Sequence, residues 1–124
     1  MLDPNFVILY VENPAESAAF YTDLLGRAPV ESSPTFVMFA LESGVMLGLW
    51  ARHTVMPAAK DSGGSELAFT VANNAAVHAM HADWSRRGLS IAQTPAVMDF
   101  GTTFVALDPD GHRLRVFAPA APGA

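Results

Sequence analysis

The stretch "YVENPAESAAF" (residues 10–20) decides the fold, because a related stretch, "TVANNAAVHAM", occurs at residues 70–80. When Val11 is placed on Val71, Asn13 falls on Asn73, and an apolar run precedes each asparagine. Asparagine is a preferred N-cap, and Pro14 suits the first turn of a helix. Both copies therefore predict a buried strand followed by a capped helix.

The segments after each helix continue the repetition. "TFVMFALESG" (35–44) resembles "TFVALDPDG" (103–111), whose last four residues predict a tight turn. An accident of composition is the alternative, but strand, cap and turn recur together. The sequence predicts an α+β fold of two tandem βαβββ repeats in a single domain, residues 1–124, with repeat one at about 5–51 and repeat two at about 65–118. The elements expected are strands at 6–11, 35–42, 45–51, 66–72, 90–93, 101–108 and 112–117, and helices at 13–26 and 73–88.

Composition narrows the classes of function. The 124 residues are 51% hydrophobic, which is enough for one compact core. A net charge of -5 with seven Lys plus Arg gives no electrostatic footprint for nucleic acid or an anionic membrane. The absence of cysteine excludes disulfides, a thiol nucleophile and thiolate metal ligands. The start "MLDPNFVILY" has no basic leader region, so we expect a cytoplasmic protein.

The segment "HRLRVF" (112–117) carries two arginines at alternate positions of a predicted strand. Side chains alternate between the two faces of a strand, so Leu114 and Val116 should enter the core. Arg113, Arg115 and Phe117 should then share the opposite face. That face is the first candidate for a functional surface.

The segments "ILYVENPAESAAFYTDLLG" (8–26) and "FVALDPDGHRLRVF" (104–117) resemble the vicinal oxygen chelate superfamily. This superfamily includes glyoxalases, extradiol dioxygenases and bleomycin resistance proteins. The resemblance spans residues 5–117, and it implies curved mixed sheets around a cavity. In the metal-dependent members, each of four strands supplies one ligand to a metal in that cavity.

The resemblance also places the four metal-ligand positions in this chain. They fall on Phe6, Leu47 (or Met46 or Gly48 one residue away), Glu66 and Arg115. Only the Glu66 carboxylate can coordinate a hard cation, and a guanidinium repels one. We therefore expect no metal and no other cofactor, and a charge-assisted pair between Glu66 and Arg115 at the place of the ion. The alternative is that both side chains reach solvent at a strand rim.

A narrower resemblance concerns "VMLGLWA" (45–51) and "DFGTTFVALDPDGHRLRV" (99–116), which look like phenazine antibiotic resistance proteins. Those are dimeric, non-enzymatic binders of an aromatic drug. We predict a homodimer that binds and sequesters a planar aromatic antibiotic or metabolite without metal and without catalytic residues. The expected ligand-binding residues are Phe6, Tyr10, Trp50, His53, Glu66, Phe100, Arg115 and Phe117.

Two other functions stay open from the sequence. One is a metal-dependent lyase or dioxygenase whose displaced metal site combines Glu66 with a histidine such as His53. The other is a fold kept only for dimerisation, with its cavity filled by side chains. For the single residues, the alternatives are that Trp50 packs in the core and that His53 is an exposed linker histidine.

Overall fold

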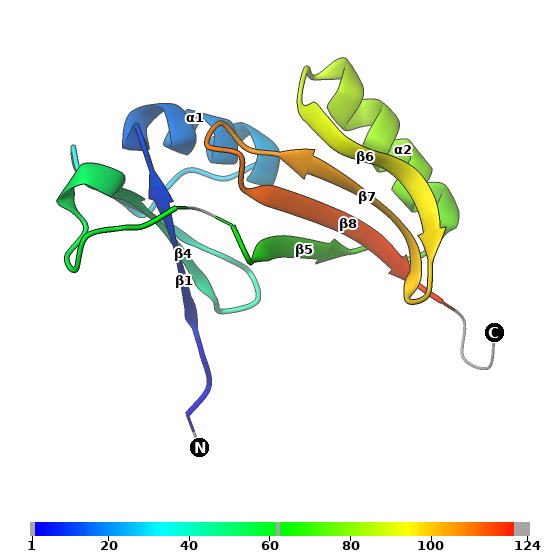
Figure 1. Ribbon diagram of the computed structural model, residues 1–124, viewed down its shortest axis with the longest axis horizontal. Coiled ribbons are helices and arrows are strands. Elements are labelled where there is room, and N and C mark those ends of the chain that lie inside the picture. The colour runs from blue at the N-terminus through cyan, green and yellow to red at the C-terminus, as the bar shows by residue number, and fades with distance from the viewer. Residues whose placement is uncertain (1, 62, 121–124) are drawn as a thin grey trace. The chain divides into compact units, whose positions relative to one another are not determined.

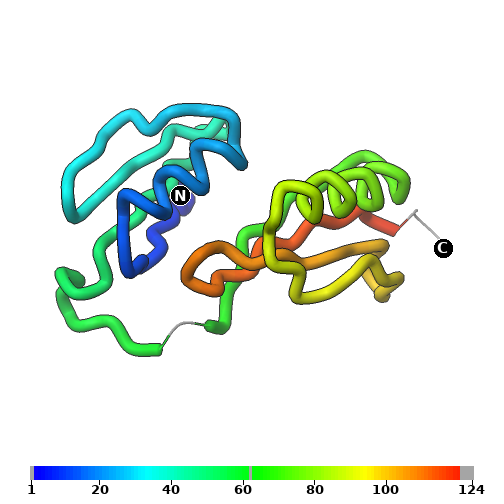
Figure 2. Tube along the Cα trace, turned by 90° about the horizontal axis from the view of Figure 1, so that it is seen from above, coloured from blue at the N-terminus to red at the C-terminus, as the bar shows by residue number. Residues whose placement is uncertain are grey.

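The computed structural model describes residues 2–61 and 63–120. The chain divides into two compact units, Met1–Asp61 and Ser62–Ala124, which correspond to the two predicted repeats. In each unit one helix lies along one face of a four-stranded sheet (Figure 1, Figure 2). The α+β class and the βαβββ plan of each repeat are confirmed.

The first unit runs β1 (Phe6–Val11), α1 (Pro14–Leu25), β2 (Glu31–Ser32), β3 (Phe36–Ala40) and β4 (Met46–Ala51), followed by the short 3-10 helix η1 (Arg52–Thr54). Its strand order is β1-β4-β3-β2. β1 pairs with β4 in parallel, and the other neighbours are antiparallel. The sheet is therefore mixed. The chain leaves β1 through the helix α1, which is the kind of long crossover that parallel strands require.

The second unit runs β5 (Glu66–Thr70), α2 (Asn74–Arg86), β6 (Ser90–Met98), β7 (Gly101–Leu107) and β8 (Arg113–Pro119). Its strand order, β5-β8-β7-β6, repeats that of the first unit. β5 is parallel to β8, and the remaining pairs are antiparallel. This mixed sheet is curved, as Figure 1 shows along β6 and β7.

The helix starts follow the predicted caps. The Asn13 side-chain oxygen accepts hydrogen bonds from the amides of Ala15 and Glu16, at 3.1 and 3.2 Å. Gly26 ends α1 with a φ of 68°, a left-handed conformation that glycine adopts without strain. The Asn73 side chain accepts from the Ala76 amide at 2.9 Å and caps α2.

The core of each unit lies between the sheet and its own helix. In the first unit the fully buried side chains include Tyr21, Phe39 and Leu49. In the second unit Trp84 packs edge-on against Phe104, with ring centroids 5.4 Å apart. Because the helices cover only one face of each sheet, the opposite faces are left for other contacts.

The "DPDG" turn joins β7 to β8 as predicted. The Asp108 carboxylate accepts from the amides of Asp110 and His112, at 2.9 and 2.8 Å, and the Gly111 amide donates to the Asp108 carbonyl at 3.0 Å. These bonds fix where β8 begins, and so which of its residues face the helix.

The largest correction to the predicted strands concerns β6, and the structure adds two short elements. β6 extends to Met98, beyond the predicted end at residue 93. Proline is tolerated in an edge strand or at a bulge, and Pro95 lies in an edge strand where the register shifts between Gln93 and Ala96. The two-residue β2 and the three-residue η1 were not predicted, because they are too short to show a periodic pattern.

The letter match between residues 35–44 and 103–111 is displaced by one residue from the structural equivalence. Phe36 pairs with Trp50, and Thr103 pairs with Phe117, at matching places in the two sheets. Phe36 therefore corresponds to Thr103, although the letters align it with Phe104. A shift of one residue exchanges the two faces of a strand, so the letter match misplaces these side chains.

Candidate functional site

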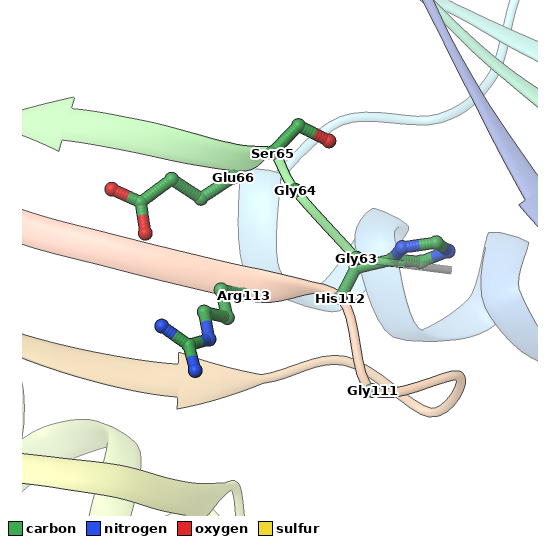
Figure 3. Close-up of a pocket in the computed structure, with 7 residues that line it drawn as sticks. All are labelled: Gly63, Gly64, Ser65, Glu66, Gly111, His112 and Arg113. Carbon is green, nitrogen blue, oxygen red and sulfur yellow. The ribbon is translucent and has the colours of Figure 1, made fainter. Parts of the chain in front are cut away.

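The helix-free face of the second sheet carries the charged residues. Glu66 lies opposite Arg113 in the pairing of β5 with β8, and Arg115 lies opposite Ala68. Leu114 and Val116 are fully buried on the helix side, as their alternation with the arginines predicts. Figure 3 shows the Glu66 and Arg113 side chains projecting to the same side, whereas the His112 ring points the other way.

Arg115 and Glu66 form the predicted ion pair. The Arg115 Nε donates to a Glu66 carboxylate oxygen at 2.6 Å. A second donor of the guanidinium, on Nη1, reaches the Thr103 hydroxyl at 3.2 Å, and that hydroxyl donates to the Val116 carbonyl at 2.8 Å. The Arg115 side chain is 17% exposed and that of Glu66 33%, so the pair borders solvent. Two contacts thus fix the guanidinium on this face.

An aromatic ring faces the guanidinium, and a second ring packs against the first. The Arg115 Cζ lies 5.6 Å from the centre of the Phe100 ring, a cation–π distance. Phe100 packs edge-on against Phe117, with ring centroids 5.9 Å apart, and remains 42% exposed. The face therefore combines hydrogen-bond donors with an accessible aromatic surface.

A polar hollow of about 560 Å³ lies at the end of β5 and β8 next to this pair (Figure 3). Glu66 borders the hollow and also binds Arg115. The hollow is lined by Gly63, Gly64, Ser65, Glu66, Gly111, His112 and Arg113.

The helix-free face of the first sheet is aromatic. Tyr10 and Trp50 are register partners on β1 and β4, and their rings meet edge to face at 6.1 Å. Phe6 and Phe36 approach each other at 6.4 Å over Gly48, where an added Cβ would come within 2.7 Å of Phe36 and 2.9 Å of Phe6. Glycine at this position leaves the room that the two rings fill.

The predicted ligand-binding residues therefore form two groups. Glu66, Phe100, Arg115 and Phe117 are brought together in the second unit, and Tyr10 and Trp50 in the first. Phe6 contacts Phe36, and His53 is an exposed residue of η1. The sequence did not single out Thr103 and Phe36, and it offered Gly48 only as a one-residue alternative to Leu47. Correct pairing of β3 with β4 and of β7 with β8 would have placed all three on these faces.

The residues at the family's metal positions do not fit a metal. Gly48 pairs with Ile8 as Arg115 pairs with Ala68, so Gly48 is the counterpart of Arg115. The assignment to Leu47 is wrong, because Leu47 is a buried residue on the helix side of its sheet. Among residues 2–61 and 63–120, no group of three or more His, Cys, Asp or Glu side chains could hold a metal ion. Phenylalanine, glycine and arginine supply no ligand beside Glu66.

The repeated βαβββ fold defines the class of protein. The chain belongs to the Glyoxalase/Bleomycin resistance protein/Dioxygenase superfamily, whose family model matches residues 4–116 and so spans both repeats. No helix in the described part of the chain has the length and apolar character needed to cross a membrane.

Three relatives give the match more detail. The phenazine antibiotic resistance protein EhpR of Enterobacter agglomerans is 27% identical over 118 residues, which cover 93% of this chain and 91% of EhpR. The solution NMR structure of protein ATC0852 from Agrobacterium tumefaciens is 56% identical, has a TM-score of 0.90, and is matched over 98% of this chain and 100% of that one. A glyoxalase-related enzyme from Fulvimarina pelagi shares the fold at 22% identity and a TM-score of 0.81, over 95% of this chain and 88% of its own.

Proposed function

We propose that this protein binds and sequesters a small planar aromatic molecule without the help of a metal ion. The observation that carries the proposal is the Arg115 guanidinium, hydrogen-bonded to Glu66 and Thr103 at a position where metal-dependent relatives need an anionic ligand. A fixed guanidinium beside an open aromatic ring favours recognition of a ligand over coordination of a cation.

The chemistry of the two faces suits such a ligand. Arg115 uses Nε and one Nη1 donor within the protein, so its remaining N–H groups can donate to acceptor atoms at a ligand's edge. The exposed Phe100 ring, and the Tyr10 and Trp50 rings of the first unit, can stack on planar rings. Binding of this kind needs burial and orientation but no catalytic group.

The relationship to EhpR supports the class of ligand. That protein is named for resistance to phenazine antibiotics. A phenazine is a planar, fused-ring aromatic molecule whose ring nitrogens accept hydrogen bonds, which matches an arginine donor next to aromatic side chains. We therefore propose a phenazine-like antibiotic or metabolite as the ligand, and protection by sequestration as the role.

Tryptophan fluorescence tests the proposal. The chain has two tryptophans, so Trp84→Phe leaves Trp50 as the only indole. We expect phenazine to quench this variant with saturation. In equilibrium dialysis, which reports binding to either unit, we expect Arg115→Met to weaken binding by about ten-fold, since a hydrogen bond from a charged group is lost. Arg86→Met removes an arginine from the exposed side of α2 and should leave the affinity unchanged.

A panel of planar aromatics that quenches neither the native protein nor the Trp84→Phe variant would contradict the proposal. The metal-dependent alternative has its own test. After incubation with zinc, nickel, manganese and iron and removal of the free ions, we expect elemental analysis to find less than stoichiometric metal. One tightly held ion per chain would favour a lyase or dioxygenase instead.

A further inference from the structure

We propose a second binding site, at the N-terminus of α2, for a carboxylate or phosphate carried on a small apolar group. A hollow of about 710 Å³ lies there on the helix side of the second sheet, away from the face of Arg115. Thr102 lines it, whereas its neighbour Thr103 points to the opposite face and binds Arg115. The hollow is lined by Ala72, Asn73, Asn74, Ala75, Val97, Met98, Gly101, Thr102, Pro119 and Ala120.

The first observation is a pair of open backbone amides. In α1 the first residue is Pro14, which has no N–H, and the next two amides donate to the Asn13 side chain. In α2 the Asn73 side chain accepts only from Ala76. Within the described residues, the Asn74 and Ala75 amides have no acceptor. Two donors therefore remain open at the positive end of a 13-residue helix.

The second observation is the hydroxyl of a nearly buried residue that faces the hollow. Thr102 is 5% exposed and lines the hollow beneath the first turn of α2. Its partners in the sheet are Val97 and Ala118, and Ala118 is buried on the helix side. In the part of the chain that the structure describes, the Thr102 side chain makes no hydrogen bond. Among the described residues, no side-chain oxygen is both fully buried and without a partner, so the Thr102 hydroxyl opens onto the hollow, where an oxygen of a ligand can accept from it.

The charges around the hollow agree with an anion. The first turn of α2 contains no acidic residue, whereas α1 carries Glu16 at the equivalent position. Asp99 lies in the turn between β6 and β7 and is not among the lining residues. Two amides and a hydroxyl form a neutral donor set, which oxyanions bind readily at helix N-termini.

The remaining lining limits the rest of the ligand. Val97, Met98 and Pro119 make one side of the hollow apolar, and Val97 is 84% exposed. A bare ion would leave this surface without a contact. The preferred ligand is therefore an oxyanion attached to a few carbon atoms, such as a short-chain carboxylate or a small phosphate ester.

Amide chemical-shift titrations of the ¹⁵N-labelled protein with acetate, butyrate and inorganic phosphate test the site. We expect saturable shifts at Asn74, Ala75 and Thr102, and tighter binding of butyrate than of acetate. The amides of Ala15 and Glu16 in α1 serve as an internal control and should not move. Tighter binding of phosphate than of butyrate would assign the site to phosphate esters, and the reverse to carboxylates.

Two variants remove the hydrogen-bond donors of the hollow and are chosen to preserve the fold. Thr102→Val keeps the shape and removes the hydroxyl, and we expect about ten-fold weaker binding. Asn74→Pro combined with Ala76→Glu transfers the start of α1 onto α2, so it should abolish binding and preserve the helix. Thr70→Val, on the other face of the sheet, is the matched control. Unchanged affinity in both site variants, or no saturable shift in the native protein, would overturn the proposal.

Discussion

At the scale of single residues, the character of the site depends on what replaces a metal ligand in each repeat. In the second repeat the position holds Arg115, bound to Glu66 at 2.6 Å. In the first repeat the position holds Gly48, and two phenylalanine rings close over it. The two faces thus differ in chemistry, one charged and one aromatic, although their backbones follow the same plan.

The Arg115–Glu66 pair should contribute little to stability. Its side chains are 17% and 33% exposed, and pairs open to solvent are worth at most about 1 kcal/mol. A double-mutant cycle of Arg115→Met and Glu66→Gln, followed by urea denaturation, should give a coupling energy in that range. The exposed Arg86–Asp83 pair is the control and should give almost none. A coupling of several kcal/mol would assign the pair a structural role instead of a binding role.

Gly48→Ala should affect ligand binding more than folding. The nearest atoms to the added Cβ are the far ends of the Phe6 and Phe36 rings, and Phe6, which is 41% exposed, can rotate aside. We expect the free energy of unfolding to fall by no more than about 1 kcal/mol. The affinity for a planar ligand should fall several-fold, because the aromatic face is reshaped. Unchanged affinity with a large loss of stability would show that the rings are structural.

At the scale of elements, the sequence predicts what has a strong local cause. Capping chemistry predicts the helix starts at Asn13 and Asn73 and the end of α1 at Gly26. Strand alternation predicts that Leu114 and Val116 point away from the arginines. The Glu66–Arg115 pair was also predictable, given the resemblance and this alternation. Local sequence patterns do not determine how distant strands pair. The letter match between the repeats was therefore displaced by one residue, and Thr103 was not predicted to lie beside Arg115.

Gly101, the first residue of β7, has less space for a side chain than the other glycines in the described part of the chain. Its φ is 139°, and an added Cβ would lie 1.9 Å from the Ala118 carbonyl oxygen, which is backbone and cannot move aside. We expect Gly101→Ala to lower the free energy of unfolding by about 3 kcal/mol or more. Gly111→Ala has a similar backbone strain but open space, so it should cost about 1 kcal/mol. Equal losses in the two variants would contradict this steric argument.

At the scale of the whole molecule, the sequence predicts two repeats, and the structure confirms each as a compact unit. That the two units of the chain pack together as one domain stays a prediction. The strand order within a unit does not determine which other unit it packs against. The resemblance to dimeric binders adds the expectation of a homodimer.

An exposed apolar edge strand supports that expectation. β1 is at the edge of its sheet, and Phe6, Ile8 and Tyr10 are more than a third exposed. Exposed apolar edges commonly mark an interface. Light scattering after size-exclusion chromatography should give twice the 13.2 kDa mass of the chain. A monomer at micromolar concentration would contradict the expectation without affecting the ligand proposal.

Binding without metal is the central claim, and equilibrium dialysis of phenazine and related planar aromatics, before and after treatment of the protein with a chelator, tests it most directly. Because the Arg115 guanidinium and the aromatic rings supply the contacts, we predict saturable binding with the same affinity in both preparations. Binding that disappears with the chelator and returns on addition of zinc, nickel, manganese or iron would contradict the claim.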